Sequence, residues 1–246
     1  MDLNIPISQI PLTVKKPEIS RELFSISVAL LLTLMFNQSF INSILPLGGW
    51  QLTLALLALL FLLNAFICQI FSIGRFQKAW LSSLIVVSAI SQYFMQQYGM
   101  LLDQSMLINA LETDRHEMSG LLSSAMLPYF VGYLLLPLTL LFWVKPRQHT
   151  LCIAVKRYSM LLVIIVALIS GLAVSQYQNY AGVFRQHRYL KHQAVPLNAL
   201  AAVVGVLKSK ITNTQDKAFI QYATDAHITP QANKPKLVIM VLGETV

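Results

Sequence analysis

Two short patterns in this sequence contain residue types that could bind a ligand or do chemistry. The first closes the chain, where the apolar run Leu237–Leu242 is followed at once by Gly243–Thr245. An unbroken apolar run of this length is typical of a strand covered on both faces in a parallel sheet. Ligands of open α/β sheets bind beyond the carboxyl ends of the strands, so Glu244 and Thr245 are expected at the edge of a ligand site.

The second pattern is a polar segment between two long apolar stretches. In a helix, Asn109, Thr113 and Glu117 fall at i, i+4 and i+8, so they share one face. A carboxylate attracts an ammonium group, while an amide and a hydroxyl form hydrogen bonds with phosphate or ester oxygens. This set of side chains therefore suits a zwitterionic head group at the membrane–water boundary.

A simpler interpretation of the same residues stays open. The polar face of an amphipathic helix is usually just solvated, and Gly-Glu-Thr after a strand is often only a turn. Gln92 and Gln96, with Asp103, could line the same cavity from the preceding helix. Asn and Gln inside membrane helices, however, commonly form hydrogen bonds with a neighbouring helix.

The elements that must position these residues are membrane-spanning helices. Hydrophobic residues make up 56% of the 246-residue chain and charged residues only 11%, which is typical of a membrane protein. Five stretches without Asp, Glu, Lys or Arg are long enough to cross a hydrocarbon core of about 30 Å. They are approximately Leu23–Leu45, Trp50–Phe71, Ala79–Met100, Leu121–Val144 and Tyr158–Gln176.

Basic residues predict the orientation, because short cytoplasmic loops are enriched in Lys and Arg. The N-terminal segment and every second loop contain Lys15, Lys16, Arg21, Arg75, Lys78, Lys145, Arg147, Lys156 and Arg157. The opposite loops contain Arg115 as their single basic residue. We therefore expect a cytoplasmic N terminus, with everything after the fifth span outside. The net charge of +8 does not indicate nucleic-acid binding, because the cations are scattered among loops.

The segment after the fifth span mixes aromatic and basic residues. Tyr177–Lys191 includes Arg185, Arg188 and Lys191, and predicts a helix lying in the membrane interface. Pro196 should end it, and a second, more apolar helix is expected from Asn198 to Lys208.

The sequence thus predicts an all-α membrane domain that ends in the first strand of an α/β domain. The expected division is a five-helix transmembrane domain over 1–176, with an extra helix at about 103–118. Interfacial helices and a linker follow over 177–235, and the strand occupies 236–246.

This order of elements resembles the lipid A phosphoethanolamine transferases of Gram-negative bacteria, which include the mobile colistin-resistance enzymes. The resemblance covers nearly all of this chain but less than half of a full-length member. It is most specific at Tyr98-Gly99, Asp103, Ser105–Asp114, Glu117, Asn179–Ala181, Phe184-Arg185, Asp225-Ala226 and Lys234–Thr245.

The resemblance implies a zinc enzyme of the inner membrane with a periplasmic, sulfatase-like α/β catalytic domain. Such an enzyme takes phosphoethanolamine from phosphatidylethanolamine onto a threonine and passes it to a lipid A phosphate, which gives polymyxin resistance. The resemblance assigns Asn109, Thr113 and Glu117 to the donor head-group site and Glu244 to zinc. The family's threonine nucleophile and its other zinc ligands would lie beyond Val246, so this chain alone is expected to be inactive.

Other functions were weighed against this one. A transporter or channel would favour charges inside the spans or paired Gly/Pro interruptions, and the sequence has neither. Two alternatives stay open: transfer of phosphoethanolamine to a core sugar or another envelope glycan, and a non-catalytic module that binds membrane lipids.

Overall fold

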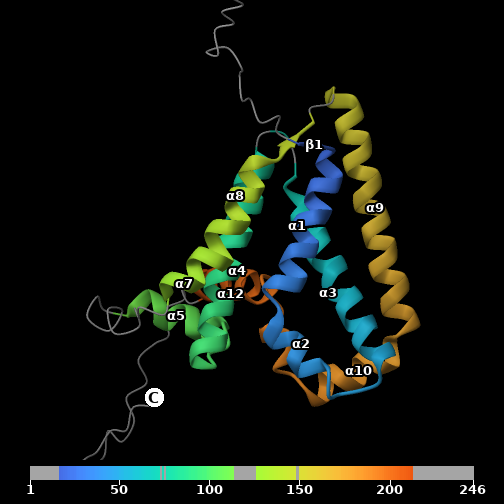
Figure 1. Cartoon of the computed structure of the whole chain (residues 1–246). Helices are drawn as coiled ribbons and strands as arrows, with labels where there is room; N and C mark the ends of the chain where they lie inside the picture. The colour runs from blue at the N-terminus through green and yellow to red at the C-terminus, as the bar shows by residue number, and fades with distance from the viewer. Residues whose placement is uncertain (1–16, 73, 75, 114–125, 148–149, 213–246) are drawn as a thin grey trace, which may run out of the picture.

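The computed structural model describes residues 17–72, 74, 76–113, 126–147 and 150–212 (Figure 1). Within these ranges the chain is mostly helical, as predicted, and it adds one small sheet. The elements are β1 (Glu18–Ile19), α1 (Arg21–Met35), α2 (Gln38–Ile44), α3 (Trp50–Ile70), α4 (Phe76–Tyr98), α5 (Gln104–Glu112), α7 (Met126–Phe130), η2 (Val131–Leu135), α8 (Leu136–Trp143), β2 (Lys145–Pro146), α9 (Leu151–Ser175), α10 (Tyr177–Gln186), α11 (Leu190–Gln193) and α12 (Leu197–Thr212).

The long helices form a bundle in which α3 packs against α1 and α9, while α4 packs against α1 and α8 (Figure 1). Three segments are long and apolar enough to cross a membrane: α3, Met126–Trp143, and Cys152–Ser175 of α9. The bent pair α1–α2 adds a fourth if it counts as one span. The described residues therefore form a multi-pass membrane bundle, and the count of five spans stays a prediction.

Helix α4 is long enough to span but carries many polar residues. Gln77, Ser88 and Gln92 are buried inside the bundle, where they replace apolar contacts. The Gln77 side chain donates hydrogen bonds to the Arg21 carbonyl oxygen at 2.9 Å and to the Ser25 hydroxyl at 3.0 Å. Polar groups of α4 thus face neighbouring helices, which is how membrane helices usually accommodate such side chains.

The predicted span Leu23–Leu45 is not one continuous helix, because the chain bends by 62° between α1 and α2. The sequence has neither Pro nor Gly at this point, so no helix-breaking residue indicated that the helix would break here. The cause is Asn37, whose side chain takes up backbone groups at the break instead of pointing outward. An inserted side chain is a known cause of helix kinks.

Asn37 connects the break to a segment far along the chain. Its amide nitrogen donates to the carbonyl oxygens of Leu32 and Val195, both at 2.9 Å. The Val195 backbone N–H donates in return to the Asn37 side-chain oxygen at 2.8 Å. Both residues are fully buried. This pair ties the α1–α2 break to the turn that precedes α12.

The helix from α7 to α8 contains a π-helical turn, η2. Pro137 has no N–H to donate, and its ring disfavours regular α-helical packing against the preceding turn. The Leu136 N–H accordingly donates to Val131, five residues earlier. The wider turn lets the helix continue through the proline.

Strands β1 and β2 are a feature that the sequence analysis missed. They pair in parallel, with Glu18 opposite Lys145 and Ile19 opposite Pro146. The Glu18 carboxylate also lies 3.8 Å from the Lys145 ammonium and 3.9 Å from Arg147 Nε. The pairing joins the segment before α1 to the α8–α9 connection, at the end of the bundle where the described basic loops gather (Figure 1).

The helices after α9 lie at the opposite end of the molecule (Figure 1). The predicted helix Tyr177–Lys191 is divided into α10 and α11, and the second predicted helix is present as α12. Tyr180 of α10 is buried, and its hydroxyl donates to the Ala55 carbonyl oxygen at 2.9 Å. It anchors α10 to α3. The linker and strand predicted after residue 212 lie outside the described residues.

The Asn37–Val195 pair gives a stability prediction. Replacing Asn37 with Ala should lower the free energy of unfolding in mixed micelles by about 1–3 kcal/mol, because the Val195 amide and carbonyl would stay buried without their partner. Asn179→Ala is the matched control, since that side chain is exposed and bonds only to Gln176 at 2.8 Å. Equal stability of the two variants would contradict the role given to Asn37.

Candidate functional site

Helix α5, which carries Asn109 of the predicted head-group residues, packs against α12. The contact is close at Gly205, where an added Cβ would lie 2.6 Å from the Gln104 side-chain oxygen. A larger residue at position 205 would require the Gln104 side chain to move. The fold thus holds α5 on the helices that follow α9, toward the end of the bundle opposite β1 (Figure 1).

The carboxylate of Asp103 begins α5. It accepts a hydrogen bond from the Met106 backbone N–H at 2.9 Å and one from the Ser105 hydroxyl at 2.7 Å. These two bonds, the Met106 bond first, lower the pKa of Asp103, and the electrostatic interaction with His192 of α11 acts in the same direction. Asp103 is therefore an ionised helix cap.

The structure brings Asn109 and Thr113 together, but not as predicted. Helix α5 ends at Glu112, and Thr113 has extended backbone angles, so the expected continuous helix over 103–118 is wrong. The Thr113 hydroxyl and backbone N–H both donate to the Asn109 carbonyl oxygen, at 2.7 and 2.8 Å. The Asn109 side chain is exposed. Glu117 lies outside the described residues, so the shared face of the three side chains stays a prediction.

Gln96 of α4 follows the simpler interpretation, whereas Gln92 does not. The Gln96 amide donates to the Gln38 side-chain oxygen at 2.7 Å, and Gln38 donates to the Tyr133 hydroxyl at 3.1 Å. Gln96 therefore connects α4 to α2 and η2 as an interhelical partner. Gln92 is fully buried, and its amide has no hydrogen-bond partner among the described residues.

An aromatic cluster between α4 and α7–η2 was missed by the sequence analysis. Tyr129 and Tyr133 stack with ring centres 4.4 Å apart, and Tyr93 meets Tyr129 edge-on at 5.1 Å. Tyr98, the last residue of α4, extends the cluster toward Asp103. The spacing of Tyr129 and Tyr133, one helical turn, is the signal that could have indicated it.

In the ranges that the structure describes, no group of three His, Cys, Asp or Glu side chains is arranged to hold a metal ion. Glu244, the residue assigned to zinc by resemblance, lies outside these ranges, so the zinc site stays a prediction.

A comparison with known protein families shows to which family this chain belongs. The profile described as phosphoethanolamine transferase EptA/EptB matches residues 60–211, which is more than half of the chain. The chain belongs to this family. The match includes α5 and all of α10 and α11, so the elements around the predicted head-group site are part of it.

Individual relatives agree with the phosphoethanolamine transferase family. The chain is 32% identical over 231 residues to phosphatidylethanolamine transferase Mcr-1 of Escherichia coli, which covers 89% of this chain and 42% of that protein. It is 26% identical over 232 residues to phosphoethanolamine transferase EptA of Salmonella typhimurium, with 91% and 42% covered. This chain thus spans less than half the length of these relatives.

The fold matches a solved member of the phosphoethanolamine transferase family. The integral membrane lipooligosaccharide phosphoethanolamine transferase A of Neisseria meningitidis superposes with a TM-score of 0.73 at 23% identity. The match covers 80% of this chain and 38% of that protein. The helices described above are therefore the membrane domain of this enzyme family.

The Asp103 cap gives a pH-dependent prediction. Asp103→Ala should destabilise α5 by about 1 kcal/mol. Because the folded-state pKa is lowered, the cap stabilises fully above the ordinary value of 3.8, and this stabilisation is lost as the pH falls below it. Hydrogen exchange of residues 104–112 should therefore differ between wild type and variant at pH 6, and the difference should shrink toward pH 3. A difference that persists unchanged at pH 3 would contradict the assignment.

Proposed function

We propose that this chain is the membrane and lipid-binding part of an enzyme that transfers phosphoethanolamine from phosphatidylethanolamine to a lipid A phosphate. The observation that carries the proposal is the family match over residues 60–211, together with the 32% identity to Mcr-1. Transfer of this kind reduces the negative charge of lipid A and so weakens the binding of cationic polymyxins.

In this proposal the donor head group binds at the exposed end of α5. The Asn109 amide is free to bond phosphate oxygens, and the Thr113 hydroxyl oxygen keeps acceptor capacity while it donates to the Asn109 carbonyl. Glu117 would attract the ammonium group. Holding the lipid in this way would turn an encounter of two lipids into a positioned reaction.

Glu244 is the one residue of this chain that we assign to the proposed zinc site. A carboxylate oxygen is an acceptable zinc ligand, but a zinc site needs three or four ligands, so further residues must come from elsewhere in the complete enzyme. Zinc there would lower the pKa of a bound hydroxyl group. The fragment described by this sequence is proposed to be inactive by itself.

The proposed acceptor of the phosphoethanolamine group is lipid A, and two alternatives to this function stay open. Lipid A is favoured by the resemblance to the colistin-resistance enzymes, while a core sugar or another envelope glycan would require the same donor site. If the protein is instead a lipid-binding module without catalysis, α5 would still bind lipid, but Glu244 would have no role. Measurement of the modified envelope molecule separates these cases.

We also propose a location in the Gram-negative inner membrane, with the N terminus in the cytoplasm. The described cations of the cytoplasmic loops, among them Arg21, Lys145 and Arg147, gather at the β1–β2 end. The α10 end would then face the periplasm, where both lipid substrates present their head groups.

Cysteine labelling tests this orientation. Cys152 is exposed at the start of α9, whereas Cys68 is buried and should not react. In spheroplasts, a membrane-impermeant maleimide should label Cys152 only after permeabilisation. Gln186→Cys in a Cys152→Ser background should be labelled without permeabilisation, because Gln186 is exposed at the end of α10. The reverse order of labelling would overturn the orientation.

The donor site is tested in the full-length enzyme. Asn109→Ala should raise KM for phosphatidylethanolamine about tenfold, because a hydrogen bond to a charged phosphate is lost. The readout is release of diacylglycerol, followed by mass spectrometry of lipid A from cells. Asn179→Ala, an exposed asparagine on α10, is the matched control. Unchanged kinetics of Asn109→Ala would return this helix to a purely structural role.

A further inference from the structure

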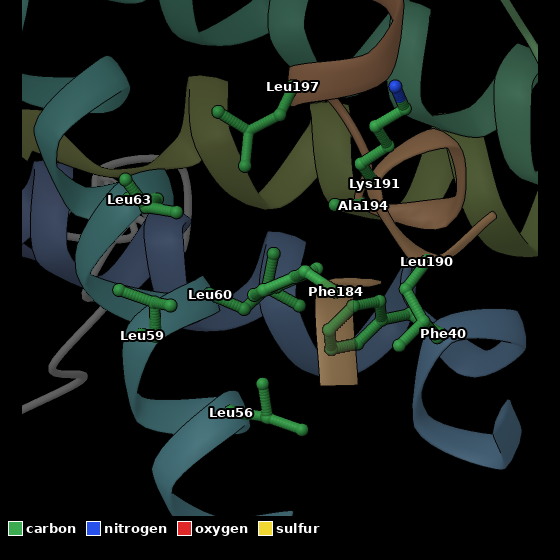
Figure 2. A pocket seen from close by; sticks show the side chains of 10 residues that line it. All are labelled: Phe40, Leu56, Leu59, Leu60, Leu63, Phe184, Leu190, Lys191, Ala194 and Leu197. Atoms are coloured by element: carbon green, nitrogen blue, oxygen red, sulfur yellow. The ribbon is translucent and has the colours of Figure 1, made fainter. Parts of the chain in front are cut away.

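Two buried places in the bundle differ in the groups that line them. Phe40, together with Leu56 and Leu60, lines an apolar pocket where α2, α3, α10 and α11 meet (Figure 2). Apolar cavities in proteins usually contain no water. The second place is a face of α4 that carries Ser88 and Gln92, which are one helical turn apart and fully buried. This face is polar, so a different occupant is expected there.

The side chains of Ser88 and Gln92 have no hydrogen-bond partner among the residues that the structure describes. This holds for the Ser88 hydroxyl and for both the nitrogen and the oxygen of the Gln92 amide. Gln77, on the same helix, is by contrast bonded through its nitrogen to the Ser25 hydroxyl. A buried donor or acceptor without a partner costs about 1–3 kcal/mol. Gln92 therefore calls for a partner that the described part of the protein does not provide.

Gln92 lies level with the break between α1 and α2. Helices α1 and α4 both run from the β1 end toward the α5 end (Figure 1), and hydrogen bonds fix their register at two points. Gln77 donates to the Arg21 carbonyl oxygen at the start of α1, and Gln96 donates to Gln38 directly after the break. Gln92 precedes Gln96 by one turn on the same face of α4. It therefore lies beside the last turn of α1.

The break leaves backbone acceptors at the same level. The last four carbonyl groups of an α-helix have no partner within the helix. One of them, the Leu32 carbonyl, accepts from the Phe36 N–H and from the Asn37 side chain. Phe36 and Asn37 are fully buried, so bulk solvent does not reach this point. When polar groups face one another without a direct bond, a bridging water is the usual connection.

We propose that Ser88 and Gln92 hold ordered water at the break, where it bridges α4 to the terminal carbonyl groups of α1. A buried water typically forms about three hydrogen bonds. The Gln92 amide offers two N–H donors and an acceptor oxygen, and the Ser88 hydroxyl can donate and accept. Water inserted at a helix bend is a known way to complete an interrupted backbone ladder. Both side chains are neutral, which favours water over an ion. The inference does not depend on phosphoethanolamine transfer.

X-ray radiolysis of the full chain in nanodiscs, in water enriched in oxygen-18, tests the proposal. Radiolysis of a bound water produces a hydroxyl radical that attacks adjacent side chains, including those that bulk water does not reach. Phe36 is fully buried at the break and should gain oxygen-18, measured by mass spectrometry. Phe40 is the matched control, because it is also buried but faces the apolar pocket (Figure 2) and should stay unlabelled. Absence of label on Phe36, or equal labelling of both residues, would overturn the proposal.

Variants of α4 test which side chains hold the water. Gln92→Leu should abolish the labelling of Phe36, and Ser88→Ala should reduce it. Ser91→Ala is the matched control and should leave the labelling unchanged, because the buried Ser91 hydroxyl already donates to the Val87 carbonyl oxygen at 2.8 Å. Undiminished labelling in Gln92→Leu would overturn the site, and undiminished labelling in Ser88→Ala would remove Ser88 from it.

The melting temperature of Gln92→Leu gives an independent readout. If water bridges Gln92 to the break, loss of the amide leaves backbone carbonyl groups without a partner, and the Tm should fall. If the site is dry, an apolar side chain of similar size replaces an unsatisfied amide, and the Tm should rise. A raised or unchanged Tm would therefore contradict the proposal. Should Gln92→Leu fail to fold, the wild-type labelling and Ser88→Ala decide the outcome.

Discussion

The buried hydrogen bonds between Asn37 and Val195 are the constraint on which the α10–α12 end of this molecule depends. They join positions 158 residues apart in the sequence, and both partners are shielded from water. In such surroundings an unpaired amide or carbonyl is costly, so the pair favours one arrangement of the break and the turn before α12. The break turns α2 away from α1, and α11 packs against α2. The helices after α9 are thereby held against the bundle rather than lying loosely on a bilayer.

Two further contacts extend this arrangement toward α5. Tyr180 anchors α10 to α3 through the Ala55 carbonyl, and Gly205 admits Gln104 so that α5 lies on α12. The position of α5 thus follows from contacts made by the helices beneath it.

Three of the five expected spans were predictable because hydrophobicity is a local property, and an apolar stretch of twenty residues has few other uses. The features that the sequence did not reveal depend on distant partners. Nothing near Asn37 indicates Val195, and two residues at Glu18–Ile19 form a strand only because β2 is available. Thr113 leaves the helix although its spacing from Asn109 fits one. Periodicity describes which residues could share a face, but the hydrogen bonds at a helix end decide where the helix stops.

Polar groups in this bundle have two different uses. Polar side chains inside the bundle, such as Gln77 and Asn64, form hydrogen bonds with neighbouring helices and so specify packing. Those near α5 divide differently: Asp103 is used by the helix cap, whereas Asn109 stays exposed. A side chain that already caps a helix has little capacity left for a ligand, while an exposed amide beside it keeps all of its capacity. The division favours Asn109 over Asp103 as the residue that meets a head group, with the cap fixing its position.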